Sequence, residues 1–366
     1  MSEKLWYKVA RKFIKAGRLP IRVSDTIIEI MKALLTEEQA RFITLLKKRS
    51  YNIDEIRPLT DMDEESLNNM LNDLMNIGVI SGIPSRSTGI MVYRKTPLLP
   101  GIIEFTLMRG ETNEKAKSLA KLYSKLYKQV VQDTQTNYDQ MVKEYRNGPS
   151  LDRVIPVEEE VKVREEVVLQ LEEISKIIEK YDPIGVTVCY CRHKKDLLDE
   201  PCETTQERRN CFAFGRTAGF LIQHGFMEKI SKEDALQIMK KAEDEGLVHK
   251  AFHTNLDIER ELNGICNCCK CCCGTFLLHY TGAVPLMDLT SHLAHVDEDL
   301  CVGCETCVQS CAAEAIELED TVAVVNDERC LGCGVCAHLC PENAISLERT
   351  EMRRVFIPPP KLIVEN

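Results

Sequence analysis

Apolar residues recur at helical spacing through the first part of the chain. Between residues 36 and 96 the pattern predicts three helices followed by two short strands. The third helix begins at Asp63 and ends at Gly78, and its apolar face is formed by Leu67, Met70, Leu71, Leu74 and Ile77. The two strands, around residues 79–80 and 90–93, flank a turn rich in proline, serine and glycine, which is typical of a β-hairpin.

Three helices followed by a hairpin resemble a winged helix, a module that often places its third helix in the DNA major groove. Here the third helix and its approach would repel phosphates, because seven acidic residues accompany a single arginine, Arg57. The acidic residues are Asp54, Glu55, Asp61, Asp63, Glu64, Glu65 and Asp73. The sequence therefore predicts a protein-docking module that binds no nucleic acid.

Further helical patterns connect this module to the second half of the chain. A long helix is expected over residues 113–146, where Asn147-Gly148-Pro149-Ser150 ends it. Another follows Pro156, with apolar residues at positions 167, 171, 174 and 178. A third begins with a capping box at Ser231 and stops at Gly246. These elements predict a mainly helical middle region.

Composition limits the class of protein. The chain has 366 residues, of which 44% are hydrophobic and 28% charged, so it has neither disordered nor fibrous character. No stretch approaches the roughly 20 uncharged apolar residues of a membrane span. Basic residues interrupt the N-terminal 17 residues, which predicts a cytoplasmic protein rather than a secreted one but leaves peripheral membrane association open. The net charge of −10 favours protein or small-molecule partners.

The cysteines occupy one half of the chain. All 18 lie between Cys189 and Cys340. Runs such as Cys271-Cys272-Cys273 do not suit a disulfide framework, because neighbouring cysteines cannot pair without strain. In a reducing compartment such dense thiolates are metal or cluster ligands.

The C-terminal cysteines form an internal repeat with an offset of 29 residues. The spacing C-x2-C-x2-C-x3-C occurs twice, as Cys301, Cys304, Cys307, Cys311 and as Cys330, Cys333, Cys336, Cys340. A glycine lies between the first two ligands of each run, at Gly303 and Gly332, where it lets backbone N–H groups approach the sulfurs. This is the spacing of two-cluster ferredoxins, in which the fourth cysteine of each run ligates the other cluster.

Over residues 296–347 the chain resembles the 2[4Fe-4S] bacterial ferredoxin family. The resemblance implies one cubane on Cys301, Cys304, Cys307 and Cys340, and a second on Cys330, Cys333, Cys336 and Cys311. One position departs from the family pattern: Pro341 follows Cys340, but Ala312 follows Cys311, which puts the rigidity of that turn in question. Zinc is the alternative metal for sets of four cysteines.

Ten further cysteines lie in the middle region: Cys189, Cys191, Cys202, Cys211, Cys266, Cys268, Cys269, Cys271, Cys272 and Cys273. By spacing, Cys266, Cys269 and Cys272 could bind three irons of another cluster, completed by Cys189 or Cys191 at the end of a β-like run. The others could bind a second metal or remain thiols. A third relay cluster, a structural zinc site and a cluster that touches substrate are all compatible with this pattern.

Over most of residues 97–350 the chain resembles a group of iron-sulfur proteins of anaerobic bacteria and archaea. The markers are Cys-x-Cys-Arg at residues 189–192 and the run Ile-Cys-Asn-Cys-Cys-x-Cys-Cys-Cys at residues 265–273, ahead of a ferredoxin module. The resemblance implies electron transfer and names no substrate.

Basic residues and histidines in this region have two interpretations each. Arg192, His193, Lys194 and Lys195 either hold an anionic substrate or lower thiolate pKa values, or form a solvated basic loop. His249 and His253 have ligand-compatible spacing, although a surface pair is the commoner case.

These patterns together predict an α+β multidomain protein. A winged-helix-like docking domain spans residues 1–112, a helical connector 113–156, a cysteine-rich helical domain 157–288, a two-cluster ferredoxin-like domain 289–350 and a tail 351–366. The expected function is electron transfer through two [4Fe-4S] clusters and at least one further iron-sulfur cluster or zinc ion, with a redox partner protein or a larger anaerobic oxidoreductase complex. The alternatives are a reductase acting on a disulfide or corrinoid at the middle site, and an iron-sulfur redox sensor.

Overall fold

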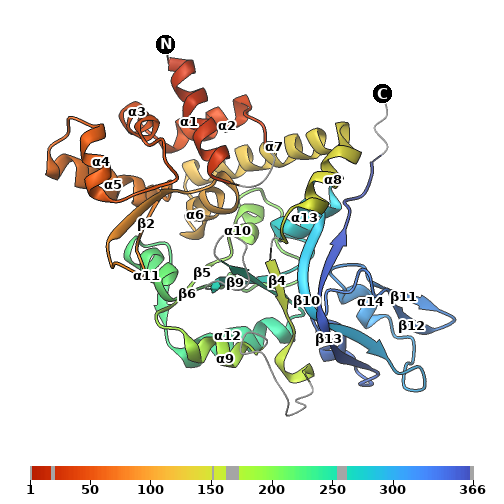
Figure 1. Ribbon diagram of the computed structural model, residues 1–366. Coiled ribbons are helices and arrows are strands. Elements are labelled where there is room, and N and C mark those ends of the chain that lie inside the picture. Colours follow the sequence, from red (N-terminus) through yellow and green to blue (C-terminus); the bar gives the residue numbers. More distant parts are fainter. Residues whose placement is uncertain (1, 18–20, 151, 162–172, 254–261, 363–366) are drawn as a thin grey trace.

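The chain folds into mixed helices and sheets (Figure 1). The N-terminal helices gather at one end, a large sheet lies in the middle, and the small elements of the C-terminal cysteine repeat lie beside the sheet. This computed structural model describes residues 2–17, 21–150, 152–161, 173–253 and 262–362.

The N-terminal module consists of five helices and a small sheet. The helices are α1 (Ser2–Ala16), α2 (Asp25–Leu34), α3 (Glu37–Leu45), α4 (Ile53–Ile56) and α5 (Glu64–Ile77). The sheet has the order β1-β3-β2, with β1 Ser50–Tyr51, β2 Ile80–Pro84 and β3 Met91–Lys95. Helix α5 has the predicted ends: Asp63 accepts the N–H of Ser66, and Gly78 closes the helix at φ 86°.

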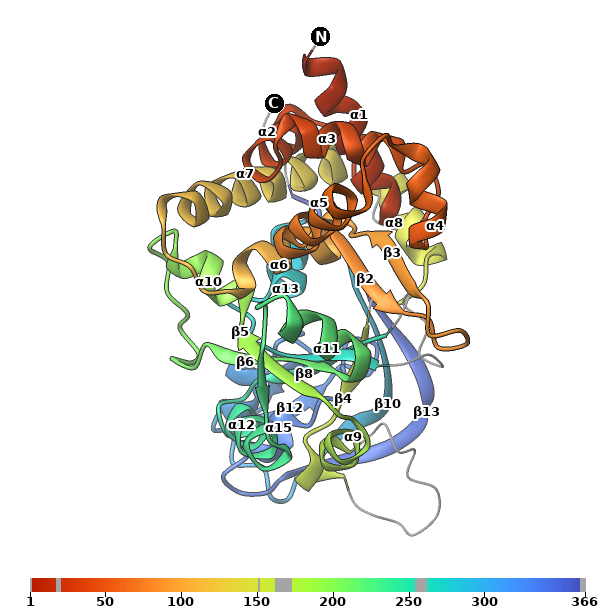
Figure 2. The same cartoon turned by 90° about the vertical axis from the view of Figure 1, so that its left-hand side faces the viewer.

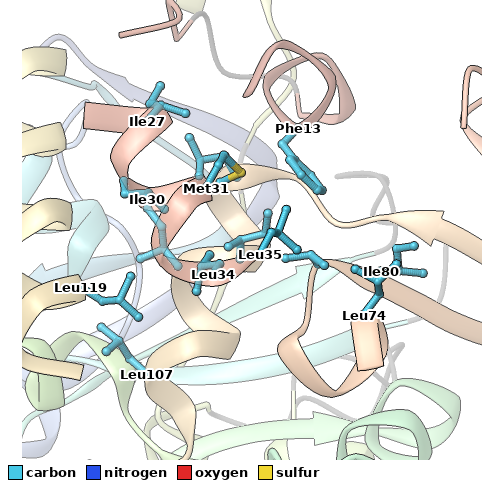
Figure 3. Close-up of a cluster of buried hydrophobic side chains, with 14 of the residues drawn as sticks. Phe13, Ile27, Ile30, Met31, Leu34, Leu35, Leu74, Ile80, Leu107 and Leu119 are labelled. Atoms are coloured by element: carbon cyan, nitrogen blue, oxygen red, sulfur yellow. The ribbon is translucent and has the colours of Figure 1, made fainter. Parts of the chain in front are cut away.

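The apolar faces of these helices form one core (Figure 3). Phe13 from α1, Ile27, Ile30 and Met31 from α2, and Leu74 from α5 are fully buried in it. Leu107 and Leu119 from the following segment join the same cluster. Burying each such side chain contributes about 1.5–3 kcal/mol relative to exposure, so the module is anchored on the connector.

The connector is helical but broken. It contains α7 (Glu114–Thr136) and α8 (Tyr138–Asn147), and α6 (Ile103–Met108) precedes it. The single long helix expected over residues 113–146 is interrupted at Asn137, whose backbone leaves helical geometry at ψ 35° while its N–H still bonds to Asp133.

An eight-stranded sheet forms the centre of the molecule, in the order β13-β10-β4-β8-β9-β6-β5-β7. The middle strands are β4 Asp152–Ile155, β5 Ile184–Val188, β6 Arg209–Phe214, β7 Glu228–Ile230, β8 Val248–His253 and β9 Leu262–Cys268. The long outer strands are β10 Leu286–Val296 and β13 Ile345–Ile357. The prediction of a mainly helical middle region is therefore corrected, because this region forms most of the sheet. Its strands are short and pair with residues far away in the sequence, so local periodicity predicted only β5 among them.

Helices cover both faces of this sheet (Figure 2). On one face lie α9 (Ile174–Lys180) and α12 (Lys232–Asp244), which pack on apolar residues of the central strands. On the other face lie α10 (Tyr190–Asp196), α11 (Gly215–Gln223) and α13 (Gly274–Tyr280), between the sheet and the N-terminal helices. Helix α12 begins at the predicted cap, Ser231, which accepts the N–H of Asp234. A helix was also predicted after Pro156. Residues 162–172 of it lie outside the described part of the chain, and α9 covers its end.

The C-terminal repeat folds between β10 and β13. It contains α14 (Thr306–Ser310), the hairpin of β11 (Ile316–Glu319) and β12 (Val322–Val325), and α15 (Val335–His338). The expected boundaries after residues 288 and 350 lie inside β10 and β13, so these strands continue from the sheet into the repeat. No helix in the described part of the chain is long and apolar enough to cross a membrane.

Candidate metal centres

Two cavities, each lined by four cysteines, lie in the C-terminal repeat. The first is lined by Cys301, Cys304, Cys307 and Cys340. The second is lined by Cys311, Cys330, Cys333 and Cys336. The fourth cysteine of each run thus faces the cavity of the other run, which is the interlocked grouping expected from the spacing.

The two turns that carry the exchanged cysteines have matching geometry. Cys311 accepts the backbone N–H of Ala315, and Cys340 accepts that of Ala344, both at 3.3 Å. Glu314 and Asn343, the residues before these donors, have φ values of 50° and 52°. The turn without proline therefore keeps the same form as the turn with it.

Ala312, which replaces the family proline, has a further contact. Its carbonyl oxygen accepts a hydrogen bond from the Tyr280 hydroxyl at 2.6 Å. Tyr280 ends α13, so this bond ties the repeat to the middle region. A second tie joins Lys270 and Glu314 at 2.6 Å.

The two repeat glycines are required by their backbone conformation and by space. Gly303 and Gly332 have φ values of 67° and 61°. A Cβ at Gly332 would lie 2.2 Å from the carbonyl oxygen of His292, and one at Gly303 would lie 2.4 Å from that of Thr321. The N–H of Gly332 also bonds to Cys330 Sγ at 3.4 Å, so the loop wraps the second cavity closely.

Burial distinguishes the two cavities. Burial raises the pKa of Cys333 to about 12 and that of Cys336 well above the usual value. Cys304 is exposed, and the hydroxyl and N–H of Thr306 lower the pKa of its thiol. The first cavity therefore lies near the surface, and the second lies against the rest of the protein.

The cysteine run at residues 266–273 divides between two environments. Cys268 and Cys273 belong to the apolar core that also contains Cys330 and Cys336 of the second cavity. Cys269 and Cys272 belong to a separate small core with Cys202. A single turn after β9 thus directs neighbouring thiols to opposite sides.

Six cysteines form the first group, which we call the thiol chain. Neighbouring thiols interact in the order Cys211, Cys266, Cys268, Cys273, Cys191, Cys189. Cys211 and Cys266 are direct cross-strand partners in β6 and β9, with their sulfurs 3.3 Å apart. Cys191 also accepts the N–H of Gly274 at 3.1 Å. The interaction of Cys189 with the neighbouring thiol of Cys191 lowers the pKa of Cys189 to about 6.

The remaining four cysteines form the second group, which we call the four-thiol cluster. They are Cys202, Cys269, Cys271 and Cys272. Cys202 lies 3.7 Å from Cys269 and 3.6 Å from Cys271, measured between sulfurs, and Cys271 lies 3.5 Å from Cys272. Hydrogen bonds from Cys269 and Cys272 lower the pKa of Cys271, so the cluster stabilises a thiolate.

This division differs from the one expected from spacing. The triplet Cys266, Cys269 and Cys272 does not share a site, because Cys266 joins the thiol chain. Cys202 and Cys211, expected in one set, are separated in the same way. The reason is that Cys266 and Cys268 lie on a strand, where side chains alternate, whereas the residues after Cys268 form a turn.

The basic residues near Cys191 lie in helix α10 and not in a solvated loop: Arg192, His193 and Lys194 are buried, and Lys195 is half-buried. Arg192 is fully buried and donates to Asn210 Oδ1 at 2.6 Å and to the carbonyl oxygen of Asn267 at 2.9 Å. Burial lowers the pKa of its guanidinium, but the thiolates of Cys189 and Cys269 outweigh this and raise it. Arg192 thus lies between the thiol chain and the four-thiol cluster.

Lys250 is a functional candidate that the sequence did not single out. Its ammonium group is fully buried, 3.1 Å from Asp152 and 2.9 Å from Asp288, and it faces Cys268 and Cys273 of the thiol chain. Burial and the Asp288 carboxylate raise the pKa of Asp152. The sequence signal that could have found it was a lysine among the apolar residues Val248, Ala251 and Phe252, since a lysine is seldom buried unless its charge is paired.

The neighbouring histidines are also buried, so their interpretation as a surface pair was wrong. His249 and His253 lie on β8 rather than on a loop. His249 bonds through Nδ1 to Asn267 Oδ1 at 2.6 Å, next to the cysteine run.

Comparison with known proteins identifies the C-terminal part. Residues 294–347 match the family model of the 4Fe-4S dicluster domain. Neither the curated proteins nor the solved structures include one with significant similarity to the chain. The matched residues contain all eight cysteines of the two cavities, so the chain carries a ferredoxin-like iron-sulfur domain at its C-terminal end.

Proposed function

We propose that this protein transfers electrons through iron-sulfur clusters. The observation that carries the proposal is the pair of interlocked four-cysteine cavities within the matched dicluster domain. Their donors are all thiols, and backbone N–H groups point at the sulfurs of Cys301, Cys311, Cys330 and Cys340. Such bonds stabilise the added negative charge of a reduced cluster.

In this proposal one [4Fe-4S] cluster is held by Cys301, Cys304, Cys307 and Cys340, and the other by Cys311, Cys330, Cys333 and Cys336. Each cluster, when bound, exchanges one electron. The chain's own residues set where electrons enter. Val302 lines the first cavity and Leu300 precedes Cys301 in the chain, and 63% and 50% of their surfaces are exposed. This apolar rim suits contact with a redox partner protein.

The thiol chain is the third redox centre of the proposal. Among the described residues, no three of its sulfurs all lie within 4.8 Å of one another, so thiols that are not neighbours along it hold the further iron-sulfur cluster. Its contact with the second cavity supports this role, since Cys268 and Cys273 share one apolar core with Cys330 and Cys336. Buried Lys250 and Arg192 offset the negative charge that thiolates and sulfides bring into such a core. Electrons would pass from the surface through the two cubanes to this interior centre.

The N-terminal module serves in this proposal as the docking domain of a larger oxidoreductase assembly. Its winged-helix-like order, helices followed by the β2–β3 hairpin, leaves the acidic approach to α5 on the surface. The charge of Arg57 is already matched by Asp54 at 3.3 Å and Glu64 at 3.1 Å. A surface of this charge favours a basic protein partner over nucleic acid, in a reducing, cytoplasmic compartment.

The test is metal analysis and spectroscopy of the full chain purified without oxygen. The proposal predicts about eight irons in the two cubanes, about four or more in the middle region, and reversible bleaching of the visible absorption by a low-potential reductant. Zinc in place of iron at the eight C-terminal cysteines would refute it. Salt-sensitive retention on a duplex DNA column would refute the docking assignment alone.

A further inference from the structure

The four-thiol cluster differs in scale from the two cysteine-lined cavities. Among the described residues, no three cysteine sulfurs of either cavity all lie within 4.8 Å of one another. In the four-thiol cluster all four sulfurs lie within 4.8 Å of one another, and four of the separations are 3.5–3.7 Å. Each ligand of a cubane binds a different iron, so its thiolates are held apart by the whole cluster. The four-thiol cluster has no room for that.

The observed separations fit a single tetrahedral ion. Zinc–sulfur bonds are about 2.3 Å long, so the edges of a zinc–thiolate tetrahedron are about 3.8 Å. The distances from Cys202 to Cys269 and Cys271 are 3.7 and 3.6 Å. Four protein ligands also close the coordination shell, which is typical of structural rather than catalytic zinc.

The surroundings suit the charge of such a site. A divalent ion on four thiolates carries a net charge of −2, and cationic residues face the cluster. Arg192 donates to Cys269, and Lys195 lies near Cys271 and Cys272. The hydroxyl of Thr204 lies 3.4 Å from the Cys271 sulfur and orients it.

We propose that Cys202, Cys269, Cys271 and Cys272 bind one zinc ion, separate from every iron-sulfur centre of the chain. Zinc binding displaces the thiol protons to solvent, and no electron is exchanged. The ion closes the loop that contains Cys202 onto the turn after β9, and Cys268 and Cys273 flank the ligands of that turn. The zinc site thereby fixes the direction of two thiols of the thiol chain. The proposal does not depend on electron transfer.

The experiment measures zinc and iron separately in the anaerobically purified full chain, together with zinc K-edge X-ray absorption. We expect one zinc per chain with four sulfur neighbours at about 2.3 Å. Cys202→Ser should lower zinc to well below one per chain, because the loop ligand is lost. Cys304→Ser is the matched control: it should lower iron by about four and leave zinc unchanged.

Several results would overturn the assignment. They are a wild-type chain without stoichiometric zinc, a single iron in this site, nitrogen or oxygen neighbours in the absorption spectrum, and a loss of about four irons with full zinc in Cys202→Ser. The wild-type spectrum decides the matter even if Cys202→Ser does not fold. Because iron is counted independently, failure of this proposal and failure of the proposed electron-transfer function give different results.

Discussion

The C-terminal repeat and the middle region use the same ligand in two different ways. In the repeat, all eight cysteines come from one compact segment, and an N–H···S turn recurs at Cys311 and Cys340. In the middle region, the ten cysteines come from the start of α10, a loop, β6, β9 and the turn after it. Only in the repeat can the cysteines be assigned to groups from their spacing, because the local geometry of the chain determines which of them lie together.

The middle region depends instead on strand pairing. Cys211 meets Cys266 because β6 pairs with β9 in that register, and Cys202 reaches Cys269 across 67 positions of the chain. A shift of one residue in this register would turn every side chain of β9 to the other face. The grouping of the middle cysteines is therefore a property of the sheet.

The largest expected effect tests the interlocked ligands of the repeat. Cys304 and Cys340 line the same cavity, so the double variant Cys304→Ser/Cys340→Ser should lose about four irons. Cys304→Ser/Cys311→Ser should lose about eight, because its two positions serve different cavities. Iron analysis after anaerobic purification gives the answer. The reverse order would mean that each run binds its own cluster.

Gly332→Ala should remove the second cluster. The new Cβ would lie 2.2 Å from a backbone oxygen in β10, so the loop around Cys330 and Cys333 must move. The matched control is Gly225→Ala, which has a similar φ of 69° and nothing within 4 Å of its Cβ. The control should cost about 1–2 kcal/mol of stability and keep all the iron. Equal iron contents in the two variants would show that the close approach is unimportant.

Lys250→Met should destabilise the junction between the two regions. It leaves Asp152 and Asp288 buried without their cation, which costs about 3–5 kcal/mol. Lys117→Met is the control, because it breaks an exposed pair with Glu114 and should cost at most about 1 kcal/mol. Urea denaturation followed by circular dichroism measures both. Similar losses of stability in the two variants would contradict the role of Lys250 as the cation that pairs with two buried carboxylates.

The smallest expected effect is a pH dependence from His279 on α13. Burial, and secondly Arg329, lower the pKa of this histidine to about 4. The unfolded chain binds the proton at about pH 6.5, so stability is complete above that pH and falls as the pH drops toward 4. The loss is at most about 3 kcal/mol. In His279→Gln the slope of unfolding free energy between pH 6.5 and 4.5 should decrease. An unchanged slope would show that His279 is protonated in the fold.

The sequence was sufficient to predict features that depend on residues close together in the chain. It predicted α5 from Asp63 to Gly78, the cap of α12, and the dicluster domain. The ligand grouping of the two cubanes remains a prediction until iron is counted in the swapped variants. The repeated spacing of the two cysteine runs made it possible to predict both the dicluster domain and its ligand grouping.

The sequence was insufficient to predict the surroundings of side chains that depend on burial and on the pairing of distant strands. The sequence did not single out Lys250 and left two interpretations open for Arg192, because nothing in their neighbours along the chain shows the partners Asp288 or Asn210. Likewise, two adjacent residues, Cys268 and Cys269, face different centres because the strand ends between them. Such assignments require the tertiary fold.

Electron paramagnetic resonance of the reduced full chain tests the central claim most directly. Two four-iron clusters held by interlocked ligands lie close together, so their reduced signals should be coupled. In Cys304→Ser/Cys340→Ser the coupling between the two cubanes should vanish, and only the second cubane and the centre of the thiol chain should contribute to the signal. We expect this change together with one-electron reduction of each cubane. A reduced chain with no cluster signal, or uncoupled signals that the double variant leaves intact, would contradict it.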